Sequence, residues 1–272
     1  MSADRPAEEL VTCDIADQIA RVHLNRPEKL NALTFPLLAQ LVQVAHRIRA
    51  DRSVRAVVLA GAGDSFCAGL DFASVAKDPK KLFLGFVPNP IRGTNRFQEA
   101  CWAWRRLPVP VIAAVEGHCY GGGIQIALAA DFRITHPEAK WSVLEGKWGL
   151  VPDMTGVRTL SELVGVETAK RLTMTAEVIT GARAHELGLA GQLSLSPYDD
   201  ALALAGELAE RSPDALAAAK RLFDKAPGRS ARRIFAAERR EQVPLLLGRN
   251  HKAARTAGLN RETPTYADRA RR

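Results

Sequence analysis

The sequence predicts an α/β fold whose last third is entirely helical. Two apolar runs, VRAVVLAG (54–61) and VPVIAAVEG (109–117), are typical of buried strands, and a glycine-containing turn follows each of them. From residue 201 onward the pattern is helical without further strands. We therefore expect an α/β core over residues 1–200 and a helical C-terminal region over residues 201–272.

The other elements follow from the spacing of apolar residues. Residues 19–24 (IARVHL) alternate as a strand does, and residues 35–49 place apolar side chains at helical spacing. Residues 72–95 combine Lys-Asp-Pro-Lys-Lys with PNP and predict an irregular excursion. The remaining elements expected before residue 200 are a strand at 131–136 and helices at 97–106, 156–175 and 182–187.

Length and composition favour a protein with a full hydrophobic core, since 47% of the 272 residues are hydrophobic. The chain has no long apolar run, and its start, MSADRPAEEL, is acidic where a signal peptide needs a basic segment and an apolar core. We therefore expect a cytoplasmic protein that does not enter a membrane. The absence of a CxxC pair favours reduced, buried thiols over disulfides or a metal site. The cysteines are Cys13, Cys67, Cys101 and Cys119.

The net charge of +8 is concentrated at the C-terminal end. Residues 220–272 contain 15 Lys/Arg and 5 Asp/Glu, a net +10, so the remainder sums to −2. A solvated helical face explains such a region, as does an anionic ligand such as a phosphate-bearing cofactor. Aromatic residues are almost absent there, which removes base stacking, so we do not expect nucleic-acid binding.

Three consecutive glycines precede a helical stretch in EGHCYGGGIQIALAADFRI, residues 116–134. Between a strand and a helix, such a run lets a ligand approach the backbone closely, although tight helix packing would also require it. The unpaired N–H groups of a first helical turn can hold a developing oxyanion. The loop at 65–71, SFCAGLD, could present a second amide to the same point. Two amides on one carbonyl oxygen make a site for an enolate.

Four stretches at their spacing carry a resemblance: FCAGLD, EGHCYGGG, WSVLEGKWGLVPD and LTMTAEVITGARAHELGLAGQL. Over residues 12–260 the chain resembles the crotonase, or enoyl-CoA hydratase/isomerase, superfamily. The resemblance implies a crotonase-like spiral of ββα units and C-terminal helices that mediate oligomerisation, as a homotrimer or homohexamer. It also implies an acyl-CoA thioester as substrate, with no cofactor beyond the coenzyme A part of that substrate.

The resemblance assigns binding residues as well. The backbone amides of Ala68 and Gly122 are implied to hold the thioester oxygen. Residues 26–33 are similar to the segment that lines the adenine and phosphate end of coenzyme A, which makes an anionic ligand for the basic C-terminal region more plausible. The implied contacts in this segment are Arg26, Lys29, Leu30 and Ala32.

Hydratases of the superfamily place two glutamates around a water molecule. Glu145 matches the second glutamate, but Gln125 stands at the first position, and an amide cannot accept a proton as a general base. A single carboxylate can still move a double bond, as the related isomerases do with the acid at the Glu145 position. Asp153 matches an aspartate of the dienoyl-CoA isomerases, which have a third acid where this chain has Gln125. Asp153 could instead cap a helix.

Other candidates are weaker. Trp141 and Trp148 could line the acyl pocket or could pack in the core. GAGDSF has Phe66 where a dinucleotide loop needs its third glycine, and Ser65 lacks the GxSxG context of a hydrolase nucleophile. His118 fits a structural role better than a catalytic one.

An enoyl-CoA isomerase is therefore the activity that we expect. Two alternatives stay open: an enoyl-CoA hydratase that uses Glu145, and a catalytically weak acyl-CoA-binding protein. Residues 72–95, which cover the pocket in relatives, have no composition that predicts the length of the acyl chain.

Overall fold

The computed structural model describes residues 9–270. The acidic N-terminal segment MSADRPAEEL, on which the expectation of no signal peptide rests, lies mostly outside the described residues. The order of the main sheet is β1-β2-β3-β4-β6-β9. β1 (Val11–Ala16) and β2 (Ile19–Leu24) form an antiparallel hairpin, and all later neighbours run parallel. The parallel strands are β3 (Ala56–Gly61), β4 (Val111–Val115), β6 (Phe132–Thr135) and β9 (Gln192–Leu193).

A smaller sheet has the order β5-β7-β8. β5 (His118–Tyr120) follows β4 directly, and β7 (Lys140–Ser142) follows β6. β8 (Ile179–Thr180) leads through α7 (Gly181–Glu186) into β9. From β4 onward, successive turns of the chain thus place one strand in each sheet, which confirms the expected spiral of strands and helices.

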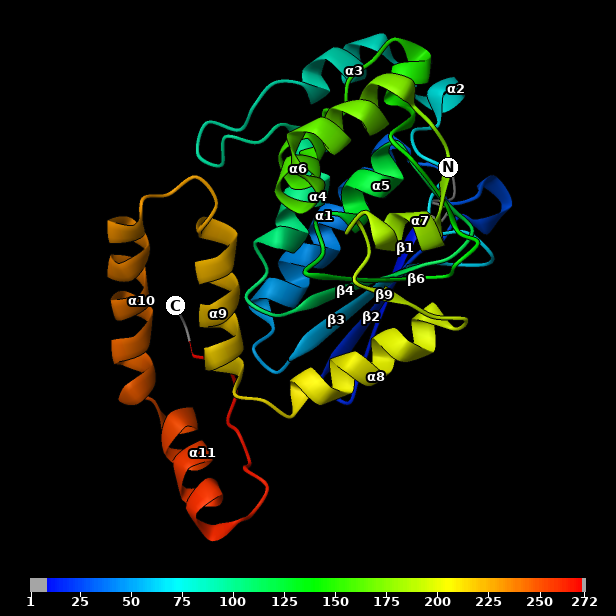
Figure 1. Cartoon of the computed structure of the whole chain (residues 1–272). Helices are drawn as coiled ribbons and strands as arrows, with labels where there is room; N and C mark the ends of the chain where they lie inside the picture. Colours follow the sequence, from blue (N-terminus) through cyan, green and yellow to red (C-terminus); the bar gives the residue numbers. More distant parts are fainter. Residues whose placement is uncertain (1–8, 271–272) are drawn as a thin grey trace, which may run out of the picture.

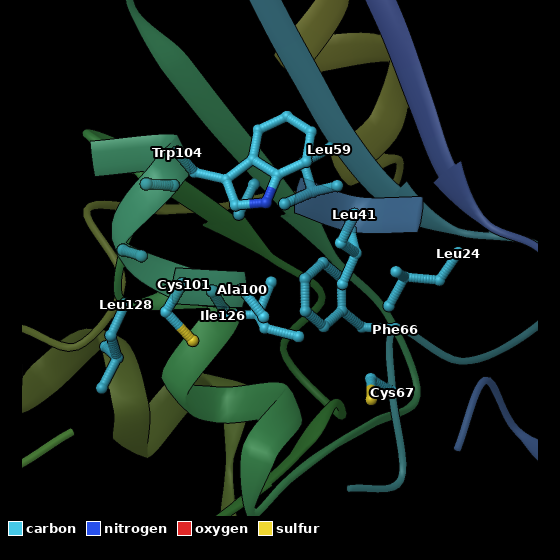
Figure 2. Packing of buried hydrophobic residues seen from close by; sticks show 14 of the residues in the cluster. Leu24, Leu41, Leu59, Phe66, Cys67, Ala100, Cys101, Trp104, Ile126 and Leu128 are labelled. Atoms are coloured by element: carbon cyan, nitrogen blue, oxygen red, sulfur yellow. The ribbon is translucent and has the colours of Figure 1, made fainter. Parts of the chain in front are cut away.

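Helices cover both faces of the main sheet (Figure 1). On one face α8 (Pro197–Ala209) packs Ala201 and Ala205 against strand residues such as Val58 and Ile112. The larger core lies on the other face; Figure 2 shows part of it, with Leu59 of β3 and Trp104 of α4. Because both of their faces are buried, the central strands β3 and β4 are apolar runs. The helices of the larger core are α1 (Phe35–Ala50), α4 (Arg96–Arg105), α5 (Gly122–Ala127) and α6 (Gly156–Thr175).

Residues 72–95 are more regular than expected. They contain α2 (Phe72–Val75) and α3 (Pro79–Gly85), each started by an aspartate. The Asp71 carboxylate accepts from the Ser74 amide at 3.0 Å, and the Asp78 carboxylate accepts from the Lys81 amide at 2.9 Å. Helices this short leave no periodic signal, so only their caps announce them in the sequence.

The expected boundary at residue 200 falls inside α8, a helix that the main sheet buries. The helices that project from the core begin instead with α9 (Pro213–Lys225), followed by α10 (Ala231–Leu246) and α11 (Arg249–Asn260) (Figure 1). A tail then returns to the core, where Arg269 is buried and donates to the carbonyls of Arg49 and Asp51, both at 3.2 Å.

Lys220 joins α9 to the core. Its side chain is only 6% exposed, and Nζ donates to Asp131 Oδ2 at 2.6 Å and to the Val109 carbonyl at 3.0 Å. Asp131 also accepts from the Val111 amide at 2.8 Å, so the ion pair ties α9 to the start of β4.

Replacing Lys220 with methionine should lower the free energy of unfolding by about 3 kcal/mol, because it leaves the Asp131 carboxylate without its cation. Chemical denaturation at one protein concentration measures this loss. Lys225→Met, on an exposed position of the same helix, is the control. A Lys220 variant as stable as that control would mean that the ion pair does not hold α9.

The C-terminal helices expose apolar side chains that the chain itself does not cover: Phe223, Phe235, Val243, Leu246, Leu247 and Leu259. Such surface is typical of subunit interfaces. With the homotrimer or homohexamer that the crotonase resemblance implies, light scattering should give three or six times the mass of one chain. A mass that stays monomeric as the protein concentration rises would contradict this.

The four cysteines are free, as expected, and three of them are buried. Burial raises the pKa of the Cys67 thiol to about 12, so it stays protonated. Within residues 9–270, no helix combines the length and hydropathy needed to cross a bilayer. The same residues contain no cluster of three or more His, Cys, Asp or Glu suited to a metal ion.

Candidate active site

The glycine run forms the turn between β5 and α5. Gly121, the N-cap, has φ 52°, a left-handed conformation that favours glycine. A Cβ at Gly122 would lie 2.7 Å from Leu33 Cδ1 and 2.9 Å from Met154 Sδ, and one at Gly123 would lie 2.6 Å from the Cys67 carbonyl oxygen. Close packing and exposure of the helix start therefore both require these glycines.

The loop at 65–71 lies beside this turn, as the sequence predicts. Cys67 and Cys119 form a parallel bridge: the Cys67 amide donates to the His118 carbonyl at 2.8 Å, and the Tyr120 amide donates to the Cys67 carbonyl at 2.9 Å. A Cβ built on Gly69 would be 3.7 Å from the Cα of Gly121. The two glycine-containing turns are thus held in contact.

The Ala68 amide, predicted to hold the thioester oxygen, is already engaged. It donates to the Leu30 carbonyl at 2.9 Å, which ties the loop at 65–71 to the segment at 26–33. An N–H group used in this way cannot also face a ligand. The prediction for Ala68 is therefore wrong in this structure.

The free N–H group of this loop belongs to Leu70 instead. Leu70 bridges to Leu33 through its neighbours: Leu33 donates to the Gly69 carbonyl at 2.7 Å, and Asp71 donates to the Leu33 carbonyl at 2.9 Å. The N–H of Leu70 consequently points away from Leu33 and has no acceptor among the described residues. The same holds for Gly122 at the first position of α5, whose N–H has no intrahelical partner.

The predicted acid Glu145 lies beside Gln125. Glu145 belongs to the 3₁₀ helix η2 (Leu144–Trp148), and Gln125 is a fully buried residue of α5. The Gln125 amide donates from Nε2 to Glu145 Oε1 at 2.6 Å, while Gln125 Oε1 accepts from the amides of Met154 and Gly156, both at 2.8 Å. Glu145 Oε2 is buried without a hydrogen-bond partner among the described residues.

The pKa values of both candidate acids are raised. Burial raises the pKa of Glu145, and the neighbouring Asp153 carboxyl group raises it further. The hydrogen bond from Gln125 lowers this pKa and so opposes both effects. Burial also raises the pKa of Asp153. The alternative that Asp153 caps α6 is wrong, because the N-cap is Thr155. Half-buried carboxyl groups with raised pKa values are suited to proton transfer.

The predicted coenzyme A segment is only partly available. Arg26 Nη1 donates to Asp71 Oδ2 at 2.7 Å and to the Ala32 carbonyl at 3.2 Å, so Arg26 holds the segment against α2 rather than offering a free cation. This hydrogen bond lowers the pKa of Asp71. Lys29 and Leu30 are exposed, and Ala32 is half-buried.

The two tryptophans differ. Trp141 is fully buried, and its indole N–H donates to Thr135 Oγ1 at 3.0 Å, so it is a core residue and not an open wall of the pocket. Trp148 is 58% exposed, and its ring centroid lies 5.1 Å from that of Phe72 in α2. This pair stands between η2, which carries Glu145, and the helix that follows Leu70.

Ser65 and His118 support the loop at 65–71. Ser65 Oγ and His118 Nδ1 are 2.9 Å apart, and Ser65 is buried. Burial lowers the pKa of His118. A serine enclosed in this way fits the structural role expected for His118 and gives no support to a hydrolase nucleophile.

Comparison with known proteins agrees with this geometry. A family model described as enoyl-CoA hydratase/isomerase matches residues 14–269. The chain belongs to the enoyl-CoA hydratase/isomerase family. This confirms the resemblance found in the sequence and supports an enzyme that acts on an acyl-CoA thioester.

Individual relatives of this family member differ in their named activities. A probable enoyl-CoA hydratase of Mycobacterium bovis is 34% identical over 209 residues, 77% of this chain and 80% of the relative. A human mitochondrial Delta(3,5)-Delta(2,4)-dienoyl-CoA isomerase is 33% identical over 225 residues, 80% of this chain and 69% of the relative. The solved enoyl-CoA hydratase of Bacillus anthracis superposes with a TM-score of 0.87 at 26% identity, covering 94% of this chain and 98% of that one.

Asn31 is a site-building residue that the sequence analysis missed. It is fully buried, with φ 57°, and Leu30 before it has φ 48°. Its Nδ2 donates to the carbonyls of Ala62 and Ser65 at 2.9 and 2.7 Å, and its Oδ1 accepts from the Arg26 amide at 2.8 Å. Asparagine adopts left-handed backbone more readily than most residues, which is the signal that could have marked it.

Asn31→Ala should lower the free energy of unfolding by about 3 kcal/mol, because it leaves buried backbone groups unpaired. The loop that carries the Leu70 amide should also lose its position, so turnover should fall with stability. Thermal and chemical denaturation measure the first effect. Asn25→Ala, which removes one exposed hydrogen bond to the Glu9 carbonyl, is the control; equal stability of the two variants would contradict the assignment.

Proposed function

We propose that this enzyme moves a double bond in an enoyl-CoA or dienoyl-CoA thioester. The amides of Leu70 and Gly122 donate to the thioester oxygen and stabilise the enolate that forms when the α-carbon loses its proton. The Glu145 carboxylate takes that proton and returns it to the γ-carbon, so the double bond shifts by one position into conjugation. The proton that leaves the α-carbon is the one that reaches the γ-carbon, so the reaction needs no cofactor.

The observation that carries this proposal is the engagement of Gln125. Its amide cannot act as a base, and its donor and acceptor groups are already used by Glu145 and by the turn before α6. Of the two positions at which hydratases carry glutamates to activate water, only the Glu145 position therefore carries a carboxylate here. A shift of a proton between two carbons requires only one.

Asp153 extends the proposal to conjugated substrates. In a 3,5-dienoyl-CoA the proton must travel from the α-carbon to the far end of the diene, and a second acid can deliver it there. The similarity to a human dienoyl-CoA isomerase supports this extension. The coenzyme A end of the substrate would then lie along Lys29, Leu30 and Ala32, with phosphates near the basic C-terminal helices.

Hydration with Glu145 alone is the second candidate, because the relatives from Mycobacterium bovis and Bacillus anthracis are named as hydratases. A catalytically weak acyl-CoA-binding protein is the third. Turnover of a panel containing crotonyl-CoA, a 3-enoyl-CoA and a 3,5-dienoyl-CoA separates the three. Wild-type hydration of crotonyl-CoA faster than isomerisation would overturn the isomerase proposal, and no turnover at all would favour the binding protein.

The two acids should respond unequally to substitution. Glu145→Gln should abolish isomerisation of both the 3-enoyl and the 3,5-dienoyl substrate, a loss of about 100- to 10,000-fold, whereas Asp153→Asn should mainly slow the dienoyl reaction. Reactions run in deuterium oxide show which carbon each residue serves.

Glu138→Gln, which removes an exposed carboxylate, is the control. Full activity of the Glu145 variant would overturn the mechanism. Equal small losses with both substrates in the Asp153 variant would reduce Asp153 to a structural residue. In the wild type, kcat/KM should fall as the pH falls through the raised pKa of Glu145, because protonation removes the base.

A further inference from the structure

We infer that Gln125 is the positioning residue of the proton carrier, fixing Glu145 on one side and the turn that carries Asp153 on the other. The inference rests on the proposed role of Glu145. Gln125 projects from the first helical turn after the glycine run, and it is fully buried. Its side chain therefore joins three elements of the site: α5, η2 and the start of α6.

A primary amide makes these contacts together without taking up a proton. The backbone amides of Met154 and Gly156 are donors, so the atom facing them must be an acceptor; both lie 2.8 Å from Oε1. The other end must then be the NH₂ group, which donates to Glu145 Oε1 at 2.6 Å. A carboxylate could accept from the two amides but could not donate to a second carboxylate. This explains why an amide replaces an acid here.

The contact with the turn stabilises an unfavourable backbone. Thr155, between the two donating amides, has φ 80°, a conformation that β-branched residues rarely adopt. A Cβ on Gly156 would lie 2.6 Å from Gln125 Oε1, so glycine is needed there for the amide to approach. Gln125 thus holds the turn that places Asp153 in the site.

The contact with Glu145 selects one oxygen for chemistry. Oε1 accepts from Gln125, whereas Oε2 has no partner within the described part of the chain, so Oε2 is the oxygen left to carry the proton. The donated N–H favours the carboxylate over the acid and opposes the effect of burial. The other titratable groups that act on or feel Glu145 are Asp153 and the buried Cys101 thiol, which burial keeps protonated by raising its pKa.

Two variants test the inference. Gln125→Met removes both contacts, so the acid limb of the pH profile of kcat/KM should move up by about 1 to 2 pH units, and kcat/KM at neutral pH should fall by about 100-fold. Gln125→Glu keeps the acceptor for the turn but places a second carboxyl group against Glu145. Those two groups should share one proton and split the acid limb into two steps.

Gln192→Met, which removes an exposed amide on β9, is the control and should leave the profile unchanged. An unshifted acid limb in Gln125→Met, with or without a lower rate, would overturn the inference, because a merely structural role moves stability but not the titration. A single unshifted limb in Gln125→Glu would do the same.

A second readout separates this inference from the proposed function. Carboxyl carbon-13 NMR of glutamate-labelled protein titrates Glu145 directly, with its signal assigned by its absence in Glu145→Gln. The pKa of Glu145 should be higher in Gln125→Met than in the wild type. This holds even if no enoyl-CoA is turned over, in which case the proposed reaction fails and the positioning role stands. Equal pKa values would remove the positioning role while leaving the reaction untouched.

Discussion

The backbone pairing of Cys67 with Cys119 is the constraint on which the site depends. Its two hydrogen bonds, 2.8 and 2.9 Å long, hold the loop after β3 against the strand that precedes the glycine run. Neither loop alone makes a site, because a single N–H donor stabilises the negative oxygen of an enolate only weakly. Brought together, the two turns present N–H groups from two separate ββα units. The proposed thioester site is thus a product of the spiral rather than of either motif.

The segment at 26–33 decides which amides remain available. The Leu30 carbonyl takes the Ala68 N–H, and Leu33 takes the carbonyl of Gly69 and the amide of Asp71, so the Leu70 N–H is left over. Two consecutive left-handed residues, Leu30 and Asn31, are needed to bring these groups into place. The buried Asn31 amide and the Arg26–Asp71 ion pair offset that strain. The segment implied to bind coenzyme A therefore also shapes the site of chemistry.

The proton carrier depends on a similar balance. Burial raises the pKa of Glu145, because an unpaired carboxylate in such a place is costly. The hydrogen bond from Gln125 lowers the cost of ionisation, and the free Oε2 leaves the carboxyl group able to exchange its proton.

The C-terminal helices are attached to this core by Lys220 and Arg269, whose partners are backbone carbonyls and Asp131. Their apolar faces are available for subunit contacts.

The amino-acid sequence by itself determined the alternation of strands and helices, the helical C-terminal third and the glycine turn, and it singled out Glu145 as the acid proposed for catalysis. These are local patterns, carried by apolar periodicity, glycines and motif spacing. Strands of two or three residues, such as β5, β7 and β8, and short helices such as α2 were invisible because they have no period. Only the tertiary structure decided that α8 belongs to the core, that Trp141 is enclosed, that Leu70 rather than Ala68 has a free amide, and that Gln125 joins Glu145 to the turn before α6. Each of these depends on which partner a donor, an acceptor or an apolar face meets across the fold, and such partners lie tens of residues away in the chain.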